Sequence, residues 1–275
     1  MNNLQTLQKE IESAPDLPTL PPGISHLLKV LTDDNINYPQ LATELENFPT
    51  IAIKIVATAN SAWAPPTSPI TTLRDACSRI GLPLVRSISI ALSVSQVFVP
   101  NRCALFDPQT FWVSALLTAE AANLCSEEFL EICPDTARLA GLLHNIGLLW
   151  LADKKPIETS EAIKISQRKD SESLSQILSD NYNLDIYTTG GFLATSMALP
   201  DILASVIESC SNNGVNSTQD LTKNHLNACS IASAVLSHAE SEDSEEDDIS
   251  NSIPYKRLAE KLPGIQSIAQ SLFFS

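Results

Sequence analysis

The sequence lacks the features that mark a secreted or membrane-embedded protein. Its six cysteines are scattered and form no Cys-x-x-Cys pair, which indicates reduced, packed thiols in place of disulfides or a zinc site. No run reaches the ~18 uninterrupted apolar residues of a membrane span. Residues 1–15 lack the basic region and apolar core of a signal peptide. We therefore expect a cytoplasmic protein with no membrane contact.

Basic residues are scarce relative to acidic ones. Lysine and arginine number 17 against 32 aspartates and glutamates, which gives a formal net charge of −15 at pH 7. A surface of this sign repels phosphate backbones and anionic headgroups, so we expect neither nucleic acid nor membrane as a partner. The acids concentrate in residues 240–248. Such a run is typical of a solvated loop, with a docking site for a basic partner as the alternative.

Glycine is also scarce, at 8 residues, whereas proline is common, at 17. Apolar residues recur at helical spacing, as in residues 24–31, and prolines with capping residues separate the segments, as at Asp107 before Pro108. Residues 50–60 are rich in isoleucine and valine, but their alanines and the missing hairpin signal favour a helix over a strand. The sequence predicts an all-α fold.

One apolar segment contains two polar residues. His144 and Asn145 interrupt residues 139–149, which as a helix would be apolar on every side and therefore buried. We expect one continuous helix from Pro134 through this segment. A histidine followed by an aspartate would offer a divalent metal an imidazole and a carboxylate, but the Asn145 amide is a far weaker ligand. A buried imidazole needs partners, because leaving it unpaired costs about 1–3 kcal/mol.

Six short motifs follow one another in a fixed order. They are residues 17–22, 48–50 with 59–62, 70–73 with 80–82, 111–112, 139–147 and 199–200. Together they resemble the HDOD domains, which are similar to HD-type phosphohydrolases but are found as signalling and regulatory modules. The resemblance implies an N-terminal helical bundle packed on an HD-hydrolase-like helical core. It also implies that catalysis is commonly absent.

The resemblance allows the ligand set to be checked. In a working HD site, histidines and aspartates from several helices surround one or two metal ions. Here Ser114 stands where a first histidine often lies, Asn145 replaces the acid after His144, and residues 232–233 lack the final aspartate. No further histidine lies near Asp185, whose carboxylate could contribute one ligand.

We therefore assign His144, Asn145 and Asp185 to a vestigial pocket and predict no catalytic residue, no metal ligand and no cofactor. His26, His225 and His238 lie outside the motifs, and we expect surface or capping roles for them. For Asn60 we expect a conformational role, in which its amide ties down the loop of residues 61–66.

The chain divides into five predicted segments. These are an N-terminal lead (1–16), an N-terminal helical subdomain (17–102), a degenerate HD-like helical subdomain (103–238), an acidic loop (239–251) and C-terminal helices (252–275). The boundary near Arg102 follows from the loop that Pro100 and Pro108 bracket. Pro263 and Gly264 predict a break in the last segment.

Three functions are consistent with this sequence. We expect a non-catalytic signalling or regulatory module that acts through contact with an unidentified signalling protein. One alternative is a metal-dependent phosphohydrolase acting on nucleotides or cyclic dinucleotides, with a metal-bound hydroxide in a rebuilt pocket. Another is a nucleotide or anion sensor that uses the vestigial pocket. Four arginines would supply the positive charge of such a sensor: Arg74, Arg79, Arg86 and Arg138.

Overall fold

The structure is a computed structural model that describes residues 22–31, 33, 35–61, 68–129, 132–168, 173–197, 199–210, 220–240 and 249–273. All regular structure in these ranges is helical, which confirms the predicted all-α class. The helices are α2 (Pro22–Leu31), α3 (Tyr38–Glu46), α4 (Pro49–Ser61), α5 (Leu73–Ile80), α6 (Leu82–Ser95), α7 (Pro108–Cys125), α8 (Pro134–Leu143), α9 (Ile146–Lys154), α10 (Pro156–Ser166), α11 (Leu174–Tyr182), α12 (Ile186–Ser196), α13 (Asp201–Ser209), α14 (Asp220–Glu240) and α15 (Ile253–Phe273), with a 3₁₀ turn at Ser126–Glu128. The predicted lead (1–16) and most of the predicted acidic loop lie outside the described residues.

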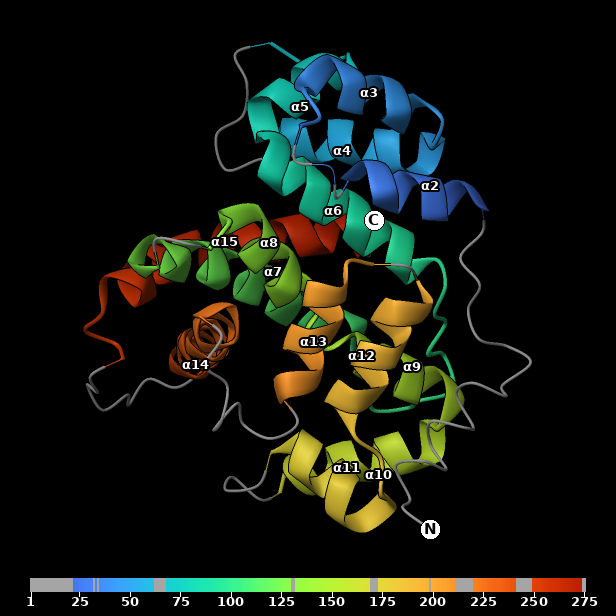
Figure 1. Cartoon of the computed structure of the whole chain (residues 1–275), viewed down its shortest axis with the longest axis vertical. Helices are drawn as coiled ribbons and strands as arrows, with labels where there is room; N and C mark the ends of the chain where they lie inside the picture. Colours follow the sequence, from blue (N-terminus) through green and yellow to red (C-terminus); the bar gives the residue numbers. More distant parts are fainter. Residues whose placement is uncertain are drawn as a thin grey trace.

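The helices form an N-terminal bundle on a larger helical core. Figure 1 shows α2 to α6 at one end of the molecule, α7, α8 and α15 across its middle, and α10 and α11 at the other end. Helix α6 contacts α2 and α4 within the bundle and α7 and α8 in the core. Helix α15 packs on both α7 and α4, so the C-terminal segment joins the two parts. The division into segments proposed from the sequence stays a prediction.

Capping residues set the helix starts as the sequence predicted. The Asn37 side chain accepts a hydrogen bond from the Gln40 amide, and the Gln40 side chain accepts one from the Asn37 amide, which forms a capping box. Asp107 accepts hydrogen bonds from the backbone amides of residues 109 and 110 at the start of α7. These contacts satisfy amides that have no partner within the helix. Residues 50–60 are helical, as expected from their alanines.

Gly81 turns the chain between α5 and α6. Its φ of +89° lies where side chains with a Cβ are strained, so glycine allows the turn at this point. The chain changes direction by 112° between the two helices. By length and composition they could cross a membrane only as this bent pair, and no single helix in the described part of the chain meets that test.

Asn60 fastens the segment that returns to α5. Its Nδ2 donates to the Ile70 carbonyl oxygen at 2.8 Å, and its Oδ1 accepts from the Ile70 amide at 2.9 Å. The expected conformational role is therefore present, with Ile70 as the partner. Residues 62–67, where the expected contacts would fall, lie outside the described residues.

Two expected helix boundaries were wrong. The chain bends at His144 and Asn145, so α8 and α9 are separate helices. The physical reason is that α8 packs on α7 whereas α9 packs on α12, and one straight axis cannot reach both partners. Conversely, α15 continues through Pro263. Its buried face, which includes Leu262 and Ile265, packs on the core and compensates for the hydrogen bond that proline removes.

Three glycines let helix backbones touch around this bend. A Cβ on Gly141 would lie 2.6 Å from the Thr118 carbonyl oxygen of α7. A Cβ on Gly147 would lie 1.9 Å from the Ile186 carbonyl oxygen of α12, and Gly190 lies at the same contact. Because distances below 3.0 Å essentially never occur for real Cβ atoms, larger residues there would separate the helices.

The Gly147 contact makes a testable prediction. Gly147→Ala should lower the free energy of unfolding by about 2–3 kcal/mol or more, because the new methyl group meets backbone that cannot rotate away. Gly23→Ala is the matched control, since the nearest atom to its Cβ would be Phe48 Cε1 at 3.5 Å. Chemical denaturation followed by circular dichroism measures both. Equal stability of the two variants would contradict the interpretation.

Candidate functional site

His144 lies at the end of α8, where the chain bends. Its side chain is buried, with 5 % of the residue exposed. The ring Nδ1 lies 2.7 Å from the Gly141 carbonyl oxygen. Since a carbonyl can only accept, Nδ1 carries the proton and donates. The imidazole therefore has the backbone partner that its burial requires.

His225 on α14 faces His144. It is fully buried, and the two ring centroids are 5.5 Å apart. The expectation of a surface or capping role for His225 was therefore wrong. The sequence held a signal that we missed: residue 225 shares a helical face with Ala228, Ala232 and Val235, all of which are buried. His26, by contrast, is exposed, and its Nε2 lies 3.2 Å from Glu44 Oε2. His238 forms a hydrogen bond with the Tyr255 hydroxyl.

Two cysteines and a tyrosine extend this histidine pair. Cys229 Sγ lies 3.4 Å from His225 Nε2, one helical turn along α14. Burial raises the pKa of the Cys210 thiol to about 12. Burial also raises the pKa values of Cys229 and Tyr187, and repulsion between the anionic forms of these neighbouring groups raises them further. These groups are therefore protonated at neutral pH.

The other two predicted pocket residues lie at helix starts. Asn145 is half-buried in the bend and precedes α9. Asp185 is the N-cap of α12, where its Oδ1 accepts a hydrogen bond from the Thr188 amide at 2.6 Å. His144 and Asn145 are neighbours along the chain, and packing of α14 places His225 beside the His144 ring. Asp185 stands at the start of a different helix, with its carboxylate engaged as a cap.

Both histidines are neutral near pH 7. Burial lowers the pKa of His144 to about 4, although the hydrogen bond to Gly141 opposes this shift. Burial, and then the neighbouring His144 ring, lower the pKa of His225 to about 3. Protonating either ring would place a charge in a site without a counter-ion among these neighbours, which is why the neutral form is favoured.

The donor set does not fit the divalent metal that an HD-type site holds. Within the described ranges, no three His, Cys, Asp or Glu side chains come together in a way that could hold a metal ion. Thiols bind metals as thiolates, but burial keeps Cys210 and Cys229 protonated. The acid of the paired motif is an amide, and the Asp185 carboxylate caps a helix. We derive no reaction step through such a metal.

Of the four arginines expected to form a positive patch, two are paired with carboxylates. Arg86 donates to Asp135 Oδ2 at 2.9 Å, and Arg138 pairs with Glu120. Both arginines line one small cavity of about 220 Å³. Arg74 and Arg79 are exposed on α5 instead. The fold therefore brings two of the four together, each beside a carboxylate.

The motif order and the helical core agree with a comparison against family models. The HDOD domain model matches residues 17–213. The chain belongs to the HDOD domain family. Its motifs from the N-terminal bundle to α13 are therefore family features, and the His144–Asn145 bend lies in the HDOD core.

Solved structures share this HDOD fold. A candidate phosphohydrolase from Shewanella amazonensis SB2B superposes with a TM-score of 0.73 at 21% identity, covering 97% of each chain. An HDOD domain protein with unknown function from Geobacter sulfurreducens gives 0.74 at 19% identity over 99% of each chain. A candidate signal transduction protein from Marinobacter aquaeolei VT8 gives 0.77 at 18% identity, covering 98% of this chain and 66% of that one. Comparison with curated proteins gave no match.

The buried histidine pair predicts a dependence of stability on pH. The folded pKa values, about 4 and about 3, lie below the ordinary 6.5, so the unfolded chain binds more protons as the pH falls below 6.5. The free energy of unfolding should therefore fall from pH 6.5 towards pH 4, by up to about 1.4 kcal/mol per pH unit for each histidine.

Denaturation at several pH values measures this slope. His225→Leu should flatten it, since one of the two buried titrating rings is removed. His26→Asn is the matched control, because it removes a histidine that is exposed and lies outside the buried pair. The interpretation fails should His225→Leu and the parent protein show the same slope.

Proposed function

We propose that this HDOD protein is a non-catalytic regulatory module that acts by contact with another protein. One observation carries the proposal: His144 and His225 are buried against each other at the HD-like bend, and the Asp185 carboxylate is engaged as a helix cap. His144 donates to the backbone, His225 lies against His144, and Asp185 caps α12. The arrangement supports a stabilising role for these residues in place of a reactive one.

Hydrolysis makes demands that this arrangement does not favour. A metal-dependent phosphohydrolase needs a cation held by several charged or neutral donors and a water that reaches it. The cavities of about 490, 220 and 550 Å³ described in this structure are lined by other residues than His144, Asn145 and Asp185. The close backbone contact at Gly147 also opposes any rearrangement of the bend that would make room for a metal ion.

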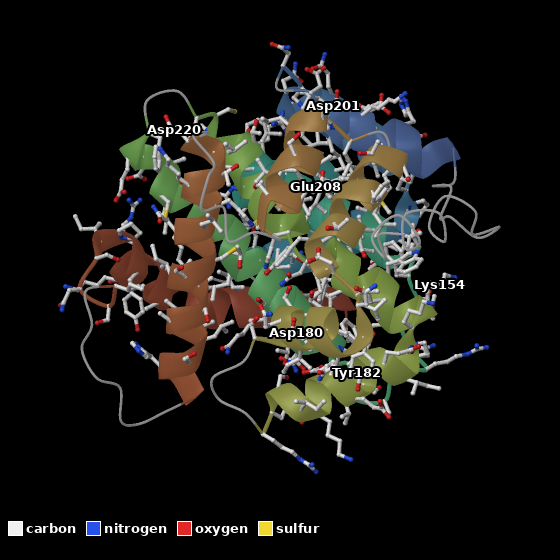
Figure 2. All side chains as sticks on the ribbon, turned by 60° about the horizontal axis from the view of Figure 1, so that its bottom comes forward. Lys154, Asp180, Tyr182, Asp201, Glu208 and Asp220 are labelled. Atoms are coloured by element: carbon white, nitrogen blue, oxygen red, sulfur yellow. The ribbon has the colours of Figure 1, made fainter. Side chains whose placement is uncertain are left out.

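The charge of the chain indicates the kind of partner. With a net charge of −15, the protein favours a basic surface on the other side of a contact. Helix α13 offers one such place: Asp201 and Glu208 are exposed towards its two ends, and Ile202 is 42 % exposed beside Asp201 (Figure 2). An apolar residue among acids suits the core and rim of a protein contact.

The six cysteines support the proposed cytoplasmic location. All six are free, and four of them are buried as single thiols. Unpaired thiols are typical of proteins that work in a reducing compartment.

Turnover assays test the non-catalytic part of the proposal. We expect the full chain, supplied with Mg²⁺, Mn²⁺, Fe²⁺ or Zn²⁺, to release no phosphate from phosphomonoesters and to open no cyclic dinucleotide above background. His144→Ala should give the same result, and His26→Ala is the control for the preparation. Metal-dependent turnover that His144→Ala abolishes and His26→Ala retains would show that the chain is an enzyme.

Site-specific crosslinking tests the contact. A photoreactive residue at position 202 on α13 should give a discrete adduct with another protein in the cells that make this chain. The same residue at position 157, which is 71 % exposed on α10 at the far end of the molecule, is the control. Asp201→Lys with Glu208→Lys should remove the adduct. Equal labelling from both positions would exclude α13 as the contact surface.

A further inference from the structure

A second cavity lies where the N-terminal bundle, the core and the C-terminal helix meet. Its volume is about 490 Å³, within the usual range for small-molecule sites. Residues of α6, α7, α8 and α15 form its walls, together with the end of α5. The walls are mainly aliphatic, including Ile80, Leu84, Leu116, Ile265 and Ile268.

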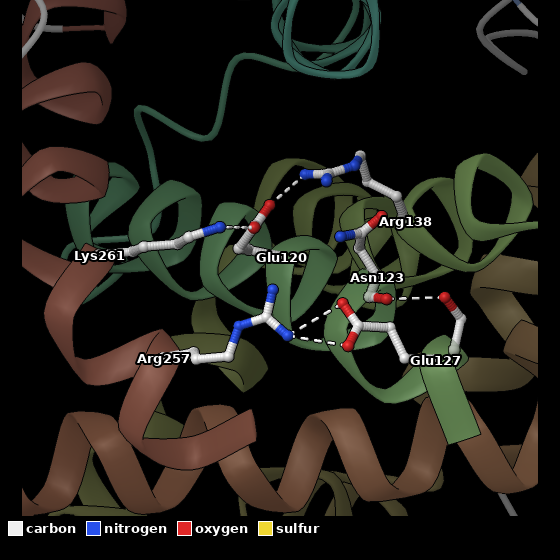
Figure 3. A network of polar contacts seen from close by, with 7 residues as sticks. Glu120, Asn123, Glu127, Arg138, Arg257 and Lys261 are labelled. Atoms are coloured by element: carbon white, nitrogen blue, oxygen red, sulfur yellow. Dashed lines mark hydrogen bonds and ion pairs between the residues drawn. The ribbon is translucent and has the colours of Figure 1, made fainter. Parts of the chain in front are cut away.

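Four charged residues complete the lining: Glu120, Arg138, Glu260 and Lys261. Glu120 lies between the two cations, because Arg138 donates to its Oε2 and Lys261 donates to its Oε1 (Figure 3). Burial by itself would raise the pKa of Glu120, but the two cations outweigh it and hold the pKa below its ordinary value. Glu120 is therefore ionised, with each oxygen already paired.

Arg138 retains donor capacity that Glu120 does not use. Its Nη1 pairs with Glu120, whereas its Nε is buried and has no partner among the described residues. The Nε and Nη2 hydrogens of a guanidinium form a planar fork that matches the two oxygens of a carboxylate. An unpaired buried donor is unfavourable, so an acceptor that reaches this edge of Arg138 would be stabilised there.

We propose that this cavity binds a small aliphatic carboxylate, with its chain among the apolar side chains and its carboxylate on the free edge of Arg138. The inference goes beyond the proposed function and does not depend on it. Neither His144 nor His225 lines this cavity, so the site is separate from the histidine pair.

The lining distinguishes this ligand from a nucleotide. None of the described residues that line the cavity is aromatic, so a nucleobase would have no ring to stack on. Glu120 and Glu260 in the wall balance Arg138 and Lys261, which disfavours a ligand carrying several negative charges. A single carboxylate on an aliphatic chain satisfies both conditions.

Binding at this position would link the two parts of the fold. Leu84 belongs to the N-terminal bundle, Leu116 to the core and Ile265 to the C-terminal helix, so a bound chain would contact all three. A ligand that binds only the folded chain stabilises it. Binding of a small molecule in the cavity would thus change the stability of the protein that makes the proposed contact.

Titration calorimetry on the purified full chain, freed of bound lipid, tests the proposal with octanoate and decanoate. We expect saturable binding of one molecule per chain and a raised midpoint of thermal unfolding. The probes 1-octanol and octyl phosphate compare the head groups. Both should bind more weakly than octanoate. Octanol has no negative charge to pair with Arg138, and octyl phosphate has more negative charge than the cations of the cavity can neutralise.

Variants locate the site. Arg138→Lys keeps a cation beside Glu120 but lacks the Nε–H, and should weaken octanoate binding about tenfold or more, as for the loss of a charge-assisted hydrogen bond. Leu84→Trp should abolish binding by filling the cavity, and Ser87→Leu is a smaller change in the same wall. Arg257→Met is the matched control, because Arg257 on α15 pairs with Glu127 in the 3₁₀ turn after α7, and neither residue lines the cavity.

Circular dichroism establishes that each variant is folded, and Ser87→Leu replaces Leu84→Trp if the larger residue prevents folding. The proposal is overturned by any of three results: no saturable binding of either carboxylate, equal or tighter binding of octanol or octyl phosphate, or binding that the cavity-filling variant leaves unchanged. Loss of binding in Arg257→Met to the same degree as in Arg138→Lys would also overturn it. Turnover and crosslinking remain separate readouts for the proposed function.

Discussion

The structure depends on the contact between the backbones of α9 and α12. Gly147 lies against the Ile186 carbonyl oxygen with no room for a Cβ, and Gly141 makes a similar approach to α7. Because the two helices on either side of the bend are each pressed onto a different neighbour, the chain must turn between them at His144 and Asn145. Side chains at this bend therefore point into a closely packed interior, where there is little room for rearrangement.

Burial then decides the chemistry of the polar groups. An imidazole in such surroundings loses the water that stabilises its charged form, so the His144 and His225 pKa values fall to about 4 and about 3. The same effect raises the pKa of the Cys210 thiol to about 12. Groups that would serve a reactive site in an open pocket are here held neutral.

The C-terminal helix adds a different kind of constraint. Lys261 on α15 pairs with Glu120 on α7, and Arg257 on α15 pairs with Glu127 just after α7 (Figure 3). Arg138 on α8 pairs with Glu120 as well. Exposed ion pairs contribute little to stability, but Glu120 is largely buried and is paired on both oxygens. These contacts hold α15 over the aliphatic cavity and connect it to the N-terminal bundle. A change in that cavity would consequently reach both parts of the fold.

The sequence by itself determined the all-α class, most helix starts and the HDOD family, because caps, prolines and apolar spacing act over a few residues, as at Asn37 and Asp107. It also revealed that Asn145 stands where an acid is needed. Only the tertiary structure decided that α8 and α9 bend apart and that His225, 81 positions after His144, is its neighbour. Contacts of that separation depend on how helices pack on one another, which local patterns do not encode.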